Sequence, residues 1–224
     1  MSESERRRGE TSREAILTAA EIVFAEHGFD GTRVDTIAHV SGYDKKLIFR
    51  YYDDKLGLYA EVLKRDDREA NALLARVFAP LLEDESAASH AHQVRTFLET
   101  MVQTLFDYLL EHPRFVRMLT REMAEGWQTF TQIASQFPTE YTDQFEALFH
   151  RARSAGLLRS DFIPVIRFTM VFQICQAYLV SLPVYQTLLP GEDLSSASAF
   201  ACAREYLVDF VVAEMMVDPG ETKS

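Results

Sequence analysis

The stretch between residues 12 and 59 constrains the fold most, because three helical patterns follow one another in it with breaks at fixed places. Apolar residues spaced i, i+3, i+4, i+7 and i+8 predict a first helix. Its inner face holds Ile16, Ala19, Ala20, Val23 and Phe24. Thr11 or Ser12 is its predicted N-cap. Gly28 stands just past its predicted end, where a left-handed residue costs least.

Two shorter helices are predicted after this first one. Thr32 with Asp35 three residues later forms the pattern of a capping box for the second helix, which Gly42 ends. Asp44 is the predicted cap of a third helix from about Lys45 to Tyr52, and Asp53 and Asp54 end that helix and cap the next. A short helix bearing basic and aromatic residues after a tight turn is typical of a helix-turn-helix that reads DNA.

This stretch of about 48 residues resembles the N-terminal domain of the tetracycline-repressor (TetR) family of bacterial transcription regulators. The residues at matching places are Phe24, Gly28, Thr32, Val34, Ile37, Ala38, Gly42, Ile48, Tyr52, Asp54, Lys55 and Leu58. The chain departs from the family pattern at Tyr43, Asp44, Leu47, Phe49 and Arg50. The departures fall on the surface expected to face DNA, so the resemblance supports the fold more firmly than any particular operator.

The predicted DNA contacts cluster on the third helix and at the starts of its neighbours. They are Thr32, Arg33, Lys45, Lys46, Leu47, Phe49, Arg50, Tyr51 and Lys55. Lys and Thr at helix starts suit phosphates, and an arginine that forks onto guanine contributes about 1–3 kcal/mol of discrimination. Apolar side chains suit thymine methyls, and a tyrosine hydroxyl can donate to a phosphate. The alternative is that these charges form an ordinary solvated face.

Residues 1–10 are predicted to be a flexible basic arm in front of a DNA-binding domain at 1–59. Arg6, Arg7 and Arg8 are suited to an adjacent minor groove. The alternative is a disordered terminus whose charge nearby glutamates offset. Residues 60–224 are the predicted effector-binding and dimerisation domain.

The net charge of −11 argues against a protein that coats nucleic acid without specificity. Residues 1–60 contribute −2 of it and the remainder −9. This balance is compatible with a reader that concentrates positive charge on one small face. The acidic remainder is then expected to repel DNA and to orient the basic end toward it.

Several classes of protein are not indicated by the sequence. The chain has no 18-residue uninterrupted apolar run and no apolar signal core, so we expect a cytoplasmic protein without a membrane span. No paired-carboxylate and histidine cluster, Glu-x-x-His or phosphate-binding glycine loop is present, so neither an enzyme, a metal site nor a cofactor is expected. Cys175 and Cys202 lie in apolar helical segments and are predicted to be small buried thiols, with a redox disulfide as the alternative.

From residue 54 onward the pattern is helical throughout, which predicts an all-α fold of about nine helices. The segments 161–182 and 194–217 are apolar on more than one face. The resemblance implies that they form a four-helix homodimer interface with a second copy. The alternative is a core buried within one subunit.

The resemblance also implies a small-molecule pocket among the bulky residues of the middle helices. Its predicted lining is Met118, Met123, Trp127, Phe130, Phe145, Phe149, Phe172, Gln176 and Tyr178. Such a mostly apolar lining with a few polar groups suits a hydrophobic or aromatic effector. The alternative is that these side chains are simply core.

Together these features predict a ligand-responsive transcriptional repressor. As a homodimer it would bind a palindromic double-stranded operator and be released by a small apolar or aromatic effector. The alternatives are a helical protein-interaction module, or an activator without a small-molecule effector.

Overall fold

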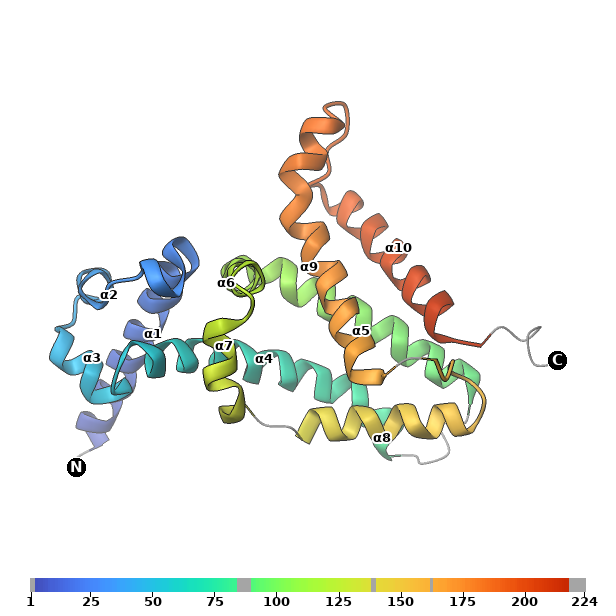
Figure 1. Ribbon diagram of the computed structural model, residues 1–224, viewed down its shortest axis with the longest axis horizontal. Helices are drawn as coiled ribbons and strands as arrows, with labels where there is room; N and C mark the ends of the chain where they lie inside the picture. Colours follow the sequence, from blue (N-terminus) through green and yellow to red (C-terminus); the bar gives the residue numbers. More distant parts are fainter. Residues whose placement is uncertain (1–2, 84–89, 138–139, 162, 218–224) are drawn as a thin grey trace. The chain divides into compact units, whose positions relative to one another are not determined.

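The computed structural model describes residues 3–83, 90–137, 140–161 and 163–217, and the regular structure in these ranges is helical (Figure 1). The helices are α1 (Glu3–Gly31), α2 (Val34–Ser41), α3 (Lys45–Tyr52), α4 (Lys55–Glu83), α5 (Ala91–Glu111), α6 (Pro113–Ala124), α7 (Gln128–Ile133), the 3₁₀ helix η2 (Ala134–Gln136), α8 (Glu140–Ser154), α9 (Pro164–Leu188) and α10 (Ala197–Met215). The predicted all-α fold is therefore confirmed.

The chain divides into two compact units. The first unit is Met1–Glu69 with His112–Pro138, and the second is Ala70–Glu111 with Thr139–Ser224. The predicted boundary between residues 59 and 60 is a division by function and stays a prediction. The units divide the chain differently, because α4 contributes to both and α6 and α7 belong to the first.

Helix α1 is longer than predicted. It begins at Glu3, so the part of the predicted flexible arm that the structure describes is helical, and neither Thr11 nor Ser12 is a cap. The Ser12 hydroxyl instead donates to the Gly9 carbonyl at 2.9 Å. The predicted left-handed glycine is confirmed, since Gly28 has φ 70° and kinks α1 before its last turn.

The predicted capping box at the start of α2 is wrong. The N-cap is Arg33, and its side chain makes no capping hydrogen bond. Thr32 is 2% exposed and its hydroxyl donates to the Gly28 carbonyl at 2.6 Å. A threonine hydroxyl can reach the carbonyl four residues back, and here that bond closes the kinked end of α1.

The two aspartate caps around α3 are confirmed. The Asp44 carboxylate accepts from the Leu47 N–H at 2.7 Å, and the Asp54 carboxylate accepts from the Gly57 N–H at 2.7 Å. A side chain at Gly57 would collide with the carbonyl oxygen of Tyr52, so this tight turn into α4 requires glycine. Asn, Asp, Ser and Thr satisfy otherwise open N–H groups at helix starts, which fixes where α3 and α4 begin.

Helices α6 and α7 are bonded to the rest of the first unit by a buried glutamate. The Glu122 carboxylate accepts from the Tyr59 hydroxyl of α4 at 2.8 Å and from the Phe130 N–H of α7 at 3.0 Å. Burial, followed by this hydrogen bond, raises the pKa of Tyr59. Arg121 donates to the carbonyl of Glu26 in α1 at 2.6 Å, and α6 packs along α1.

In the second unit, α5 packs against both α9 and α10, and α8 packs against α9. Aromatic rings fill the space between these helices and α4, with centroid distances of 5.2 Å for Phe78 and Phe97 and 4.2 Å for Phe145 and Phe149. Cys175 is buried as predicted. The prediction that Cys202 is buried is wrong, because Cys202 lies on an exposed part of α10.

One carboxyl group is buried in α4 of the first unit. Asp66 is 4% exposed. Burial and then the Glu21 carboxylate raise the pKa of Asp66 to about 7, while Arg65 and His112 act in the opposite direction. Because the folded protein binds this proton more tightly than the unfolded chain, ionisation of Asp66 lowers stability as the pH rises from about 4 to about 7.

Replacing this carboxyl by a neutral amide should remove that penalty. We expect Asp66→Asn to raise the free energy of unfolding at pH 8 by about 2–4 kcal/mol and to have little effect near pH 4. Urea unfolding of both proteins from pH 4 to pH 8 measures the difference. Asp30→Asn, at an exposed position of α1, is the matched control. Parallel stability curves for wild type and Asp66→Asn would contradict the assignment.

Candidate nucleic-acid interface

Helix α3 has one buried and one exposed face. Ile48 and Tyr52 are buried, and the Tyr52 hydroxyl donates to the Arg13 carbonyl of α1 at 3.0 Å. Lys46 and Arg50 are exposed on the opposite side. The anchoring of the inner face fixes the direction in which the outer side chains point, as a helix that enters a groove requires.

The predicted contacts Leu47 and Phe49 are partly exposed on α3. Lys45 pairs with Asp35 of α2 at 3.1 Å, and its ammonium lies 5.9 Å from the centre of the Phe49 ring. Both groups of that ion pair are well exposed, so the pair is weak and a phosphate can compete for the lysine. Lys45, Leu47 and Phe49 therefore remain candidates beside Lys46 and Arg50.

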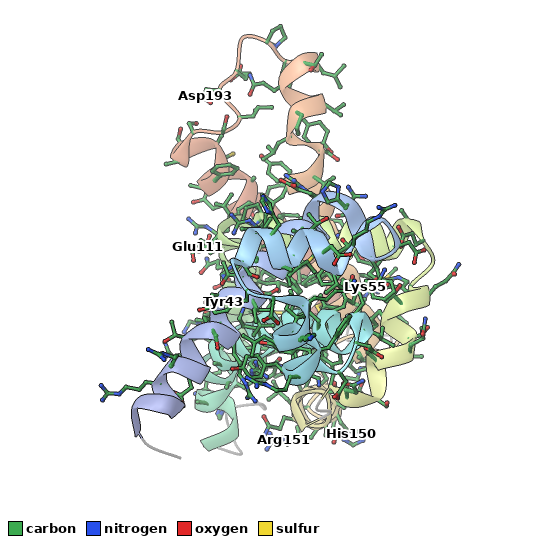
Figure 2. The ribbon with its side chains drawn as sticks, turned by 90° about the vertical axis from the view of Figure 1, so that its left-hand side faces the viewer. Tyr43, Lys55, Glu111, His150, Arg151 and Asp193 are labelled. Atoms are coloured by element: carbon green, nitrogen blue, oxygen red, sulfur yellow. The ribbon has the colours of Figure 1, made fainter. Side chains whose placement is uncertain are left out.

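Lys55 and Thr32 have structural partners that sequence reasoning missed. The Lys55 ammonium donates to the carbonyls of Phe29 at 2.9 Å and Thr32 at 3.3 Å, and it lies 4.3 Å from the centre of the Phe29 ring. Figure 2 labels Lys55, the first residue of α4, and Tyr43, which lies two residues before the start of α3. The side chains of Lys55 and Thr32 are thus bonded within the fold, and their phosphate contacts stay predictions. Arg33 is exposed and remains a candidate.

Tyr51 connects α3 to the N-terminal part of α1. Its hydroxyl lies 3.0 Å from the Ser12 hydroxyl, and this hydrogen bond is the main cause that lowers the pKa of Tyr51, with Arg50 and Arg13 adding to it. The guanidinium carbons of Arg13 and Arg50 lie 4.7 Å and 5.5 Å from the centre of the ring. Tyr51 therefore positions two arginines in addition to its predicted role as a contact.

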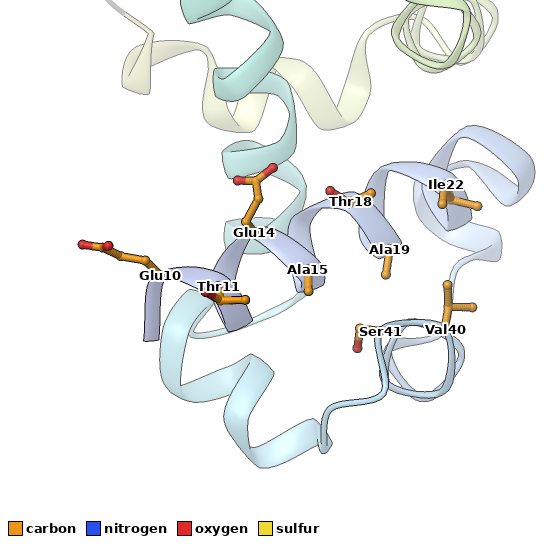
Figure 3. A pocket seen from close by; sticks show the side chains of 9 residues that line it. All are labelled: Glu10, Thr11, Glu14, Ala15, Thr18, Ala19, Ile22, Val40 and Ser41. Carbon is orange, nitrogen blue, oxygen red and sulfur yellow. The ribbon is translucent and has the colours of Figure 1, made fainter. Parts of the chain in front are cut away.

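A groove beside this surface has the wrong charge for DNA. It runs between α1 and the end of α2 (Figure 3), and its lining is Glu10, Thr11, Glu14, Ala15, Thr18, Ala19, Ile22, Val40 and Ser41. Two carboxylates and no cation line it. Glu14 is paired with Arg65 of α4 at 2.9 Å, so Glu10 supplies the negative charge that disfavours a phosphate there.

The predicted effector-pocket residues do not all belong to one unit. Met118, Met123, Trp127 and Phe130 lie in the first unit, whereas Phe145, Phe149, Phe172, Gln176 and Tyr178 lie in the second. In the first unit Met118 is buried and Met123 is exposed, and the rings of Trp127 and Phe130 are 5.7 Å apart. In the second unit Phe145, Phe149 and Gln176 are buried.

The second unit has a groove that sequence reasoning missed. It lies between α4 and α5, and its lining is Arg76, Val77, His92, Gln93, Thr96, Phe97 and Thr100. Phe97 packs against Phe78 and against the predicted pocket residue Phe149, with ring centroids 6.3 Å apart in the second case. In the sequence, Thr96 and Thr100 are four residues apart, on either side of Phe97, and this spacing could have indicated a polar edge beside an apolar groove. Within the described residues, no three His, Cys, Asp or Glu side chains are grouped to hold a metal ion.

Helix α9 exposes an apolar stripe along its length. Ile166, Met170 and Ile174 are exposed four residues apart in its first half, and Val180, Val184 and Leu188 are exposed four residues apart in its second half. Tyr206 and Phe210 are exposed on α10. By length and composition α9 could also cross a membrane, and 17% of its apolar 18-residue segment is buried. The opposite face of α9 carries Val171 and Cys175, which are buried. A helix with one covered and one uncovered apolar face is typical of an oligomer interface.

Two family models match this chain. Residues 16–62 match "Bacterial regulatory proteins, tetR family", and residues 95–211 match "Tetracyclin repressor-like, C-terminal domain". Together they span the helix-turn-helix and most of the helices that follow it.

Curated relatives and a solved structure agree with these matches. The chain is 25% identical to the transcriptional repressor NicS of Pseudomonas putida, over 75% of each chain. It is 26% identical to the transcriptional repressor SCO4008 of Streptomyces coelicolor, over 81% of this chain and 85% of the relative. The fold is similar to that of FadR from Bacillus subtilis in complex with stearoyl-CoA, with a TM-score of 0.60 at 15% identity over 90% of this chain and 98% of FadR.

Proposed function

Since the chain belongs to the tetR family of bacterial regulatory proteins, we infer that it is a transcriptional repressor and not an enzyme. We propose that it binds a palindromic operator as a homodimer. A small apolar or aromatic effector releases this homodimer from the operator. The proposal includes the division at residues 59 and 60 into a DNA-binding and an effector-binding domain. It also includes a cytoplasmic location, where both DNA and metabolites are accessible.

The arrangement of α3 carries the DNA-binding part of the proposal. Ile48 and Tyr52 fix the helix from inside, and Lys46 and Arg50 point outward without a carboxylate partner among the described residues. A fixed helix with exposed guanidinium and ammonium groups fits a major groove, where arginine can bind guanine through two hydrogen bonds.

We expect Arg50→Ala to weaken operator binding by about 1–3 kcal/mol and to relax the base preference at one position of each half-site. Lys46→Ala should weaken binding to all sequences alike. Gel retardation and footprinting on DNA upstream of the protein's own gene and its neighbours measure both effects. Arg117→Ala, on an exposed part of α6, is the control. A wild-type protein that retards no fragment at low salt would exclude operator binding and favour a protein-interaction module.

The apolar stripe of α9 supports the homodimer. Ile166 and Met170 are 52% and 50% exposed, and Leu188 is 69% exposed near the end of the helix. A second copy of the same stripe offers a complementary apolar surface, because two-fold symmetry places equal patches against each other. Two linked readers also gain affinity from binding two half-sites at once.

Placing a charge in this stripe should separate the subunits. We expect Met170→Glu to reduce the mass in solution from twice 25.6 kDa to 25.6 kDa, because a carboxylate buried between two apolar helices lacks a partner. Sedimentation equilibrium measures the mass. Ala147→Glu, on the exposed surface of α8, should leave the mass unchanged. A wild-type monomer at micromolar concentration would contradict the homodimer.

The second-unit groove supports an effector with an apolar body and a polar or anionic end. Phe97 connects the groove to the aromatic side chains of α8, where Phe145 and Phe149 are buried. Arg76 and His92 lie on the groove's lining beside two threonine hydroxyls. Guanidinium and imidazole groups suit a carboxylate, while the rings suit an alkyl or aromatic body. The FadR structure with stearoyl-CoA provides an example of an amphipathic anion in this fold.

Filling the groove should abolish the effector response. We expect decanoate or 3-phenylpropionate to raise the melting temperature of the wild type and to release it from the operator, and Thr96→Trp to lose both responses. Gln103→Trp, on an exposed part of α5, is the matched control. Differential scanning fluorimetry and gel retardation measure the two effects. If Thr96→Trp keeps the response of the wild type, the groove is not the effector site.

A further inference from the structure

The N-terminal part of α1 lies against the recognition helix instead of leading away from it. The Ser12 and Tyr51 hydroxyls are hydrogen-bonded at 3.0 Å. Gly9 adds to this contact, since a Cβ at that position would lie 3.8 Å from the Tyr51 hydroxyl oxygen. The Tyr52 hydroxyl bonds the backbone of the same segment at Arg13. The segment from Gly9 to Arg13, little more than one turn of α1, is thus fixed beside the C-terminal half of α3.

This contact gathers positive charge. Arg13 of α1 and Arg50 of α3 both lie over the Tyr51 ring, at 4.7 Å and 5.5 Å from its centre. The structure gives neither of them a carboxylate partner within the described residues. The chain has 34 acidic and 23 basic residues, so acidic side chains are in excess. Two arginines without a carboxylate partner are therefore notable in this protein.

Two guanidinium groups held beside one ring create a local positive charge that favours an anion. A DNA phosphate supplies that anion in a geometry that arginine matches with two hydrogen bonds. Arg50 points outward, toward the base pairs that α3 would read, and Arg13 lies beside the same ring. A backbone phosphate flanking the read bases is therefore the ligand that fits Arg13.

We propose that Arg13 binds a backbone phosphate beside the recognition helix, with Tyr51 as the residue that positions it. This inference rests on the proposed operator binding and adds α1 to the interface. It also changes the role of the N-terminal segment. Minor-groove arms enter DNA as chain segments that leave the domain, whereas Arg13 acts from a helix fixed to α3.

The test is the salt dependence of operator binding by the full-length protein. Arg13→Ala should weaken binding about three- to tenfold for all sequences alike, and it should lower the slope of log K against log salt by about one, as the loss of one phosphate contact predicts. Arg13→Lys should restore the slope and part of the affinity, because it keeps the charge without the fork. Arg117→Ala is the matched control for loss of one exposed positive charge from the first unit.

The role of Tyr51 is tested by a double-mutant cycle. Tyr51→Phe keeps the ring beside Arg13, so Arg13→Ala should still cost its full factor in that background. Tyr51→Ala removes the ring, so Arg13→Ala should then cost less than twofold. Thermal unfolding of each variant checks that the fold is retained, and Arg13→Gln provides a second neutral variant if alanine lowers the melting temperature.

The outcomes separate the two proposals. If wild type binds an operator and both Arg13→Ala and Arg13→Gln keep its affinity and salt slope, the inference on Arg13 is overturned and operator binding stands. If the affinity falls equally in both tyrosine backgrounds, the positioning role of Tyr51 is overturned. If the wild type binds no DNA at low salt, both the proposed function and this inference fall.

Discussion

The packing of the first unit depends on satisfying the backbone carbonyls at the carboxyl end of α1. The last carbonyls of a helix have no partner within it, and a buried helix end must find donors elsewhere. Here Arg121 of α6 donates to Glu26, Thr32 donates to Gly28, and Lys55 of α4 donates to Phe29 and Thr32. These donors come from three different parts of the chain. The kink at Gly28 thus becomes the point at which the first unit is held together.

This arrangement explains how an eight-residue recognition helix keeps its position. A helix as short as α3 is unstable by itself, so its direction must come from its caps and its buried face. Asp44 begins it, and Ile48 and Tyr52 dock its inner face. The bonds from Lys55 fix the start of α4 directly after it. The exposed side chains of α3 are therefore presented by a framework that is bonded to α1 through Tyr52 and Lys55.

Hydrogen bonds between residues close in the sequence were predictable, whereas those between distant segments were not. Asp44 and Asp54 cap helices through N–H groups three residues away, so the pattern alone identifies them. Thr32 and Lys55 match the same kind of local pattern, but their partners are carbonyls that come close only when α1 has kinked and α4 has docked. Ser12 likewise resembled a cap, and its partner Tyr51 is 39 residues away. The split of the predicted pocket residues between two units has the same origin. Likewise, an apolar pattern on two faces of α9 does not tell which face α5 covers.

The ion pairing of individual basic side chains, more than the net charge of the chain, indicates which face of an acidic regulator can bind DNA. Lys64, Arg65 and Arg114 each have a carboxylate nearby, so their charges are largely neutralised within the first unit. On α3 and the facing turn of α1, Lys46, Arg50 and Arg13 keep their charges exposed to solvent. The groove carrying Glu10 and Glu14 lies along another side of α1. A phosphate chain approaching this unit therefore meets attraction on one side of α1 and repulsion on another. At physiological salt such fields extend only about 8 Å, so this local contrast, and not the charge of −11 spread over the whole chain, determines the face that docks.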